Sequence, residues 1–155
     1  MKYLFIILFL PAMSFAQNKG YANLYGGVSW KENAKGLFNL SVGLLASGAT
    51  GIGAGVGFIE YDKPYIPITA DISFFGKPDK LSPVIIGKAG YGVYNGQSTS
   101  SPMRGGFTAS WYAGLSIPAG KTKALLMVGY STYTFTTKSL STRDNRYSVC
   151  LGIKI

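Results

Sequence analysis

The sequence has no histidine, a single cysteine at position 150, and only six acidic residues in a chain of 155. One cysteine cannot form an internal disulfide bond, so disulfides do not stabilise this chain. Without histidine, the chain cannot form a catalytic dyad or triad that needs an imidazole, and it lacks most of the nitrogen and sulfur ligands of zinc sites. We therefore expect no metal site and no cofactor.

The scarcity of acids also limits acid–base catalysis. Asp71 is the only acidic residue that lies away from the connectors, in the middle of a segment that we interpret as a strand. The others lie in or beside connectors, where carboxylates among lysines and arginines are usually solvated; they are Glu32, Glu60, Asp62, Asp79 and Asp144. We expect no catalytic residues and no enzymatic activity, with lipid acyl transfer by chemistry that needs no histidine left open as an alternative.

The apolar run at the N-terminus is too short to be a transmembrane helix, because it covers only residues 3–10. It follows a lysine and precedes small residues, which is the form of a secretory signal peptide. We expect residues 1–16 to be a cleaved leader and residues 17–155 to form one exported domain.

Four glycines stand at every second position of "GIGAGVGF", residues 51–58. A dinucleotide-binding loop needs its third glycine three residues after the second, and Val56 and Phe58 occupy those positions. Period two is instead the geometry of a β-strand, whose alternate side chains point to opposite faces. We expect this glycine face to lie in a crowded interior, where it makes room for large side chains such as Tyr25 and Tyr112.

Eight segments of alternating character follow one another, each near the 9–11 residues that a tilted strand needs to cross a bilayer. They are Tyr21–Trp30, Leu37–Ala46, Gly51–Glu60, Ile66–Phe75, Pro83–Tyr94, Gly106–Ile117, Ala124–Thr136 and Arg146–Ile155. An even number of consecutive antiparallel strands can close without a free edge. The predicted fold is all-β: an eight-stranded antiparallel up-and-down transmembrane β-barrel with a packed lumen.

The volume of the side chains decides which face of each strand points inward. Eight strands leave an interior just wide enough for side chains, and eight faces of Leu, Ile, Val, Phe and Trp would overfill it. We therefore place the apolar faces outward and expect Tyr25, Asn39 and Tyr112 to fill the lumen, leaving no aqueous channel. The alternative is a secreted soluble barrel that binds a small apolar ligand inside, as lipocalins do.

The connectors predict which end of the barrel faces outward. Gly- and Pro-rich turns at one end contrast with longer polar connectors at the other, which is typical of outer-membrane barrels. The longest connector is Asn95–Arg104, and it shares its end with the connector at 138–145. Because exposed loops on rigid scaffolds often carry binding sites, our candidate binding surface is Asn95, Gln97, Arg104, Lys138 and Arg143.

Aromatic residues gather near the predicted strand ends, as interfacial girdles do. At the long-connector end they are Trp30, Phe38, Phe58, Tyr61, Tyr65, Tyr94, Phe107, Phe135 and Tyr147, and at the other end they are Tyr21 and Phe74. The formal net charge of +9 comes from scattered lysines and arginines that can pair with lipid headgroups. The chain has no basic cluster, so we expect no nucleic-acid partner.

Asp71 and Lys88 are the only charged residues in the middle of a predicted strand. A hairpin in which Phe75 faces Val84 also sets Asp71 opposite Lys88, with both side chains on the non-lipid face. An unpaired buried charge is costly, so we predict an ion pair inside the lumen. The rival interpretation is a register two residues away, in which each charge is hydrated separately.

A leader ending "SFAQ", eight amphipathic strands and the last strand "RYSVCLGIKI" resemble the small eight-stranded outer-membrane β-barrel proteins of Gram-negative bacteria. The chain ends on the aliphatic Ile155, where many members end on an aromatic residue. The resemblance implies export, recognition of the last strand by the barrel-assembly machinery, and insertion among outer-membrane lipids. It implies a non-enzymatic role, structural or in binding an extracellular ligand through the loops, without a large open pore.

Overall fold

The computed structural model describes residues 20–45, 49–77, 79–98, 101–137 and 140–155, and the leader expected at 1–16 lies outside these ranges. Nine strands form in the described residues: β1 Gly20–Trp30, β2 Lys35–Leu45, β3 Thr50–Ile59, β4 Ile66–Phe75, β5 Ser82–Val93, β6 Asn95–Ser98, β7 Ser101–Ala119, β8 Thr122–Thr136 and β9 Ser141–Lys154. No helix within the described ranges is long and apolar enough to cross a membrane.

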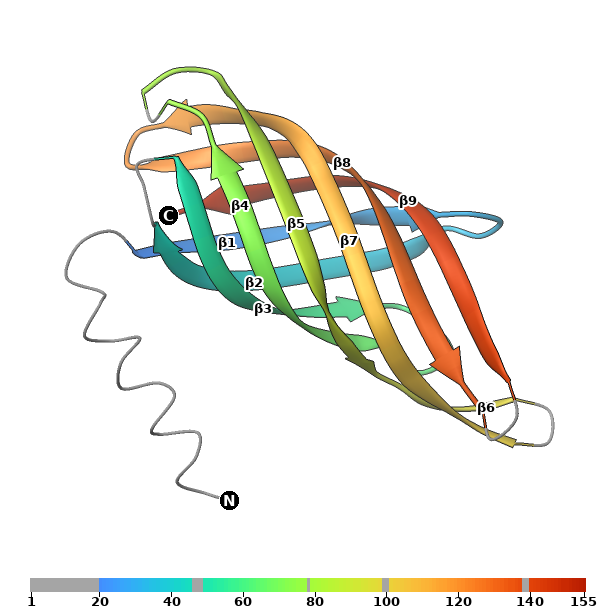
Figure 1. Ribbon diagram of the computed structural model, residues 1–155. Coiled ribbons are helices and arrows are strands. Elements are labelled where there is room, and N and C mark those ends of the chain that lie inside the picture. Colours follow the sequence, from blue (N-terminus) through green and yellow to red (C-terminus); the bar gives the residue numbers. More distant parts are fainter. Residues whose placement is uncertain (1–19, 46–48, 78, 99–100, 138–139) are drawn as a thin grey trace, which may run out of the picture.

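Eight of these strands close into a barrel (Figure 1). Each pairs antiparallel with its neighbours in the chain, β1 pairs with β9, and β5 pairs with β7. The short β6 continues β5 and pairs only with β7. The predicted fold class, a closed eight-stranded antiparallel barrel, is therefore confirmed.

The strands are strongly tilted, as the register around the ring shows. The ladder of paired residues that starts at Asn23 on β1 and runs through β2 to β8 arrives at Asp144 on β9. Asn23 itself pairs with Lys154 across the closing seam, so the offset is 154 minus 144, or ten residues. With strands ~4.8 Å apart and a rise of ~3.3 Å per residue, that offset gives a tilt of about 40° from the barrel axis.

Apolar side chains cover the outside of the barrel. Strand β4 alternates strictly between exposed and buried residues, with Ile68 and Ile72 outward and Asp71 and Ser73 inward. The same alternation places a belt of large apolar residues on the outer surface, among them Leu24, Val42, Ile52, Val56, Ile85, Trp111, Leu115, Val128, Val149 and Leu151. A soluble barrel with an apolar interior would have the opposite facing, so the lipocalin-like alternative is wrong. The barrel is built as an integral membrane protein.

The glycine face of β3 points into the lumen, as predicted. The three atoms nearest to a Cβ atom on Gly51 would all belong to the ring of Tyr21, and a Cβ atom on Gly53 would lie 2.8 Å from the Tyr21 hydroxyl. The large neighbour is therefore Tyr21 rather than Tyr25 or Tyr112, which lie against each other instead. Period two identified the inward face, but the barrel's tilt decides which side chain lies opposite a given glycine.

The longest predicted connector is mostly strand. Residues 95–98 and 101–104 pair as a hairpin, and β8 and β9 continue as a second hairpin to Thr136 and Ser141. Arg104 and Arg143 consequently lie in strands, not in loops. The sequence did not indicate this because a hairpin outside the bilayer buries no apolar face and needs no alternating pattern. Together, β6 to β9 extend beyond the barrel at the long-connector end (Figure 1).

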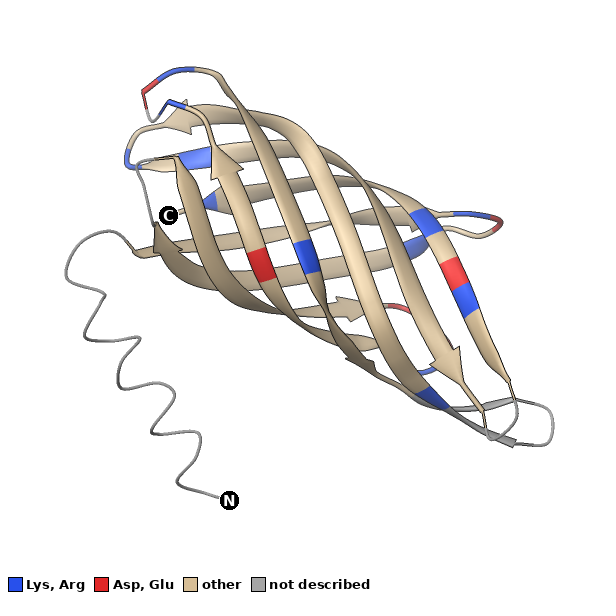
Figure 2. Ribbon diagram, in the orientation of Figure 1, with Lys and Arg blue, Asp and Glu red and all other residues tan. Residues whose placement is uncertain are grey.

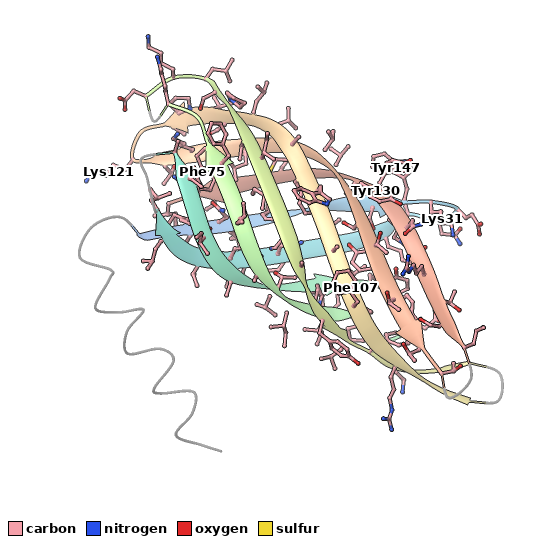
Figure 3. The ribbon with its side chains drawn as sticks, in the orientation of Figure 1. Lys31, Phe75, Phe107, Lys121, Tyr130 and Tyr147 are labelled. Carbon is pink, nitrogen blue, oxygen red and sulfur yellow. The ribbon has the colours of Figure 1, made fainter. Side chains whose placement is uncertain are left out.

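The aromatic girdle is smaller than predicted. Trp30, Phe38, Phe58, Phe107 and Tyr147 are exposed on the outside, and Figure 3 shows Tyr130 and Tyr147 pointing away from the barrel. Four other residues assigned to the long-connector girdle lie inside, where they join a core cluster: Tyr61, Tyr65, Tyr94 and Phe135. Tyr21, assigned to the opposite girdle, is also buried in the lumen.

Candidate functional site

A charged pair lies at the centre of the lumen. Asp71 on β4 stands directly opposite Lys88 on β5, in the register in which Phe75 faces Val84. The Lys88 Nζ atom is 3.5 Å from Asp71 Oδ2, and the two side chains are 2% and 0% exposed, respectively. Figure 2 shows one acidic and one basic position side by side in the middle of β4 and β5, with the other charges toward the two ends of the barrel.

Lys88 binds the opposite wall as well as Asp71. Its Nζ donates hydrogen bonds to Ser41 Oγ at 2.9 Å, to the Tyr25 hydroxyl at 3.2 Å and to Asn39 Oδ1 at 3.4 Å. Asp71 has fewer partners, because its Oδ1 accepts a hydrogen bond of 2.7 Å from Thr69 while its Oδ2 accepts none. Lys88 thus ties β5 to β1 and β2 across the lumen, whereas Asp71 depends on Lys88 for its second oxygen.

The contact between Lys88 and Ser41 resembles the base and nucleophile of a Ser–Lys hydrolase, but its surroundings favour a structural role. Ser41 is 2% exposed and Lys88 is 5% exposed. The ring of Tyr25 lies over Lys88 at 5.3 Å and packs edge-on against Tyr112 at a centroid separation of 5.2 Å. Both residues are buried beside these rings, so we interpret the contact as part of the packed interior of the barrel.

A second cluster lies at the barrel mouth on the long-connector side. The Tyr61 hydroxyl donates a 2.6 Å hydrogen bond to Asp144, and Arg146 Nε donates to the same carboxylate at 2.7 Å. Arg146 also donates to the carbonyl of Asn33 at 2.8 Å, and Lys31 lies 3.8 Å from Asp144. Burial, followed by the hydrogen bond to Asp144, raises the pKa of Tyr61.

Aromatic rings fill the mouth behind this cluster. Tyr61, Tyr65, Tyr94, Tyr133 and Phe135 contact one another with centroid separations from 5.0 to 6.5 Å, mostly edge to face. Tilted and T-shaped aromatic pairs of this kind are each worth about 0.5–1.5 kcal/mol beyond the area that they bury. Side chains therefore pack inside the lumen at two levels, the Lys88 network at its centre and these rings at its mouth.

Sequence reasoning missed the mouth cluster. Asp144 was assigned to a connector, and Arg146 was placed at the very start of a strand. Both belong to the interior of the longer β9, and Arg146 is buried, so Asp71 and Lys88 are not the only charges within strands. Tyr61 comes from the connector between β3 and β4 and reaches a residue 83 positions away, which no local pattern can indicate.

The candidate binding residues come from two hairpins that project from this end. Arg104 and Arg143 are exposed, on β7 and β9. Asn95 and Gln97 belong to β6, whose backbone alone is described, and Lys138 lies outside the described residues. In the part of the chain that is described, no three His, Cys, Asp or Glu side chains gather as a metal site would require.

No family model matches the chain, and no curated protein matches it. Among solved structures, it is similar to the N-terminal β-barrel domain of OprF from Pseudomonas aeruginosa, with a TM-score of 0.61 and 14% identity over 89% of this chain and 98% of that one. A de novo designed transmembrane β-barrel aligns at a TM-score of 0.49 with 20% identity, over 89% of this chain and 96% of that one. The Yersinia pestis outer membrane protein Ail in a phospholipid bilayer nanodisc aligns at 0.44 with 16% identity, over 88% and 100%. The match to OprF places this chain in the fold of the small eight-stranded outer-membrane β-barrels.

Proposed function

We propose that this protein is a non-enzymatic outer-membrane β-barrel without a large open pore, which anchors a protruding β-sheet for binding at the cell surface. The observation that carries the proposal is the facing of its residues: an apolar belt surrounds a lumen packed with tyrosines and hydrogen-bonded polar groups. Such a barrel is stable only in a bilayer and offers no wide path for solutes.

Conductance tests the absence of a pore. Purified barrel reconstituted in planar bilayers should give no steady conductance of porin size, because Tyr25 and Tyr112 obstruct the centre and the aromatic rings obstruct the mouth. Fractionation of cells that express the full chain should recover it in the outer membrane, extractable only with detergent. A stable porin-sized pore, or recovery in the soluble periplasm, would contradict this proposal.

Export and assembly follow from the two ends of the chain. The expected leader at 1–16 would direct the chain to the periplasm and be cleaved there. The last strand presents Tyr147, Val149, Leu151 and Ile153 on its outer face, the apolar surface through which the barrel-assembly machinery would recognise it. A chain truncated before β9 should accumulate in the periplasm unassembled.

The protruding sheet offers a free strand edge for binding. Strand β9 begins at Ser141, but its pairing with β1 ends at Tyr147 opposite Trp30. No strand of the described residues pairs with the outer edge of β9 before Tyr147. An edge of this kind can take up an extended peptide as an additional strand.

The direction of the backbone groups identifies the residues that would pair. Ala22 and Ile155 exchange both backbone hydrogen bonds between β1 and β9. Because antiparallel strands alternate between bonded and non-bonded pairs, the odd-numbered residues of β9 turn their N–H and C=O groups toward the β1 side. Ser141, Arg143 and Asn145 therefore present donors and acceptors along the free edge. The charge of Arg143 favours an acidic partner segment.

A proline at position 143 tests this binding role. Arg143→Pro removes one N–H from the free edge and leaves the β8 ladder intact, whereas Arg143→Gln removes only the charge. Short synthetic peptides with glutamate at alternate positions should bind barrels in nanodiscs, bind Arg143→Gln more weakly, and fail to bind Arg143→Pro. Equal binding by all three proteins would refute peptide binding at this strand edge, without affecting the claim that the barrel is anchored in the membrane and closed.

A further inference from the structure

A β-bulge interrupts β7 where the strand leaves the barrel. Gly105 pairs with Phe135 and Thr108 pairs with Tyr133, so the two residues between them, Gly106 and Phe107, stand opposite Thr134 alone. Bulges bend a strand and change the direction in which its side chains point. A Cβ atom on Gly106 would lie within 3.3 Å of Thr134 atoms, so a side chain at this position would press against the partner strand.

The bulge brings Arg104 and Phe107 to the same face. Residues three apart in a regular strand point to opposite faces. Here, Phe107 is 59% exposed on the outer surface, and Arg104 pairs with the exposed Thr136 before the bulge. The extra residue at the bulge shifts the inward–outward alternation of β7 by one position, so both side chains lie on the outside of the barrel.

These two residues line a pocket on the outer surface together with Tyr91, Thr136 and the glycines of the bulge. The Tyr91 hydroxyl donates a 2.9 Å hydrogen bond to the carbonyl of Gly105, which fixes the ring against the bulge. All six carboxylate side chains of the protein lie in the described ranges, and none of them forms an ion pair with Arg104 there. By contrast, Arg146 and Lys31 at the same end both contact Asp144.

The position of the pocket indicates what reaches it. Tyr91 and Phe107 belong to the outward apolar belt, at its long-connector end, and each is more than half exposed. Arg104 lies beyond these two rings, farther from the centre of the belt, at the level where the lipid headgroups begin. A site with two aromatic rings on the hydrocarbon side and an uncompensated guanidinium on the headgroup side fits an anionic amphiphile that lies in the membrane.

We propose that this pocket binds the phosphate-bearing headgroup of a membrane lipid in the leaflet at the long-connector end of the barrel. Arg104 binds the phosphate through the planar, two-pronged geometry of its guanidinium. Tyr91 and Phe107 pack against the glycerol or sugar backbone and the first carbons of the acyl chains. The inference requires only that the barrel lies in a membrane and is independent of peptide binding at the β9 edge.

Lipid retention by the purified barrel tests the proposal. Native mass spectrometry in detergent would measure affinities for phosphatidylglycerol and phosphatidylcholine with the same chains, for wild type, Arg104→Gln, Phe107→Ala and the matched control Arg143→Gln. Loss of one charge-assisted contact should weaken phosphatidylglycerol binding by about tenfold in Arg104→Gln. Phosphatidylcholine carries the same phosphate, but its choline cation offsets the charge, so the same substitution should weaken its binding by less. Phe107→Ala should weaken binding of both lipids, and Arg143→Gln should change neither.

Four outcomes would contradict the proposed site. Equal losses of phosphatidylglycerol binding in Arg104→Gln and Arg143→Gln would mean that diffuse positive charge attracts the lipid. No loss of phosphatidylglycerol binding in Arg104→Gln, or no effect of Phe107→Ala on either lipid, would mean that the pocket does not bind the lipid. Displacement of the lipid by inorganic phosphate at millimolar concentration would identify a free anion as the ligand instead of a lipid headgroup.

Discussion

Replacing one member of the Asp71–Lys88 pair should destabilise the barrel, and by unequal amounts. Asp71→Asn keeps an oxygen facing Lys88, which still has Ser41, Tyr25 and Asn39 as acceptors. Lys88→Met keeps the length of the side chain but leaves the Asp71 carboxylate with Thr69 alone. Lys88→Met should therefore be the more costly substitution.

The magnitudes follow from the charge that each variant leaves unpaired. Breaking a buried ion pair on one side costs about 3–5 kcal/mol. We expect about 3–4 kcal/mol for Lys88→Met and about 1–2 kcal/mol for Asp71→Asn, whose lysine keeps its other acceptors.

Urea unfolding in lipid vesicles, followed by tryptophan fluorescence, would measure these free energies for wild type, both single variants and the double variant. The double variant should lose at least about 1 kcal/mol less than the sum of the single losses, because its residues interact. Lys77→Met, at an exposed turn position, is the control and should stay within about 0.5 kcal/mol of wild type. Strictly additive losses, or a larger loss in Asp71→Asn than in Lys88→Met, would refute the reasoning.

Three further predictions concern the lumen, the mouth and the topology. Gly51→Ala should destabilise the barrel by about 1–3 kcal/mol because its Cβ meets the Tyr21 ring. In a Tyr21→Leu background, the same urea assay should give little or no loss for Gly51→Ala. An equal loss in both backgrounds would mean that the added Cβ clashes with another residue. The pKa of Tyr61 is raised in the folded state, so above pH 10.0 the unfolded chain loses the hydroxyl proton more readily than the folded protein does. Wild type should therefore lose unfolding free energy faster than Tyr61→Phe as the pH rises above 10.0. Equal losses in the two proteins would mean that the hydroxyl is exposed. Trypsin added to intact cells should cut after Lys31, in the connector between β1 and β2 at the long-connector end, and spare Lys121, in the turn between β7 and β8 at the opposite end; the reverse pattern would mean that the topology is inverted.

The strands and their facing could be predicted from the sequence because both depend on a local pattern. Alternation along Ile66–Phe75 identifies the lipid face without knowledge of any neighbour, and volume decides which way it points. The register of the β4–β5 hairpin also follows locally, since one turn sets all ten of its pairs. The facing of Asp71 and Lys88 thus depends only on residues between 66 and 93.

The mouth and the bulge could not be predicted because they depend on the whole ring. Tyr61 meets Asp144 only because the strands are offset by ten residues around the barrel, which no single hairpin reveals. The bulge at Gly106 reverses the phase of β7 for the residues beyond it, so strict alternation gives Arg104 the wrong face. Tyr65, Tyr94 and Phe135 fall at strand ends. Aromatic residues occur there both in an outward interfacial girdle and in a packed barrel mouth, so residue type alone does not tell the two apart.

The two tryptophans provide the most direct test of the central claim, that the apolar faces meet lipid while the lumen is packed. Both point outward: Trp111 is 64% exposed and Trp30 is 41% exposed. They lie on one ladder of paired residues, three strands apart. At a tilt of about 40°, this separation places Trp111 about 9 Å deeper in the bilayer than Trp30.

Quenching of single-tryptophan variants by lipids brominated at different depths would measure this arrangement. With Trp30→Phe, the remaining Trp111 should be quenched most by bromines deep in the acyl chains. With Trp111→Phe, the remaining Trp30 should be quenched most by bromines near the headgroups, and aqueous iodide should quench neither residue strongly. Strong quenching of both tryptophans by iodide, with no effect of brominated lipids, would contradict the account.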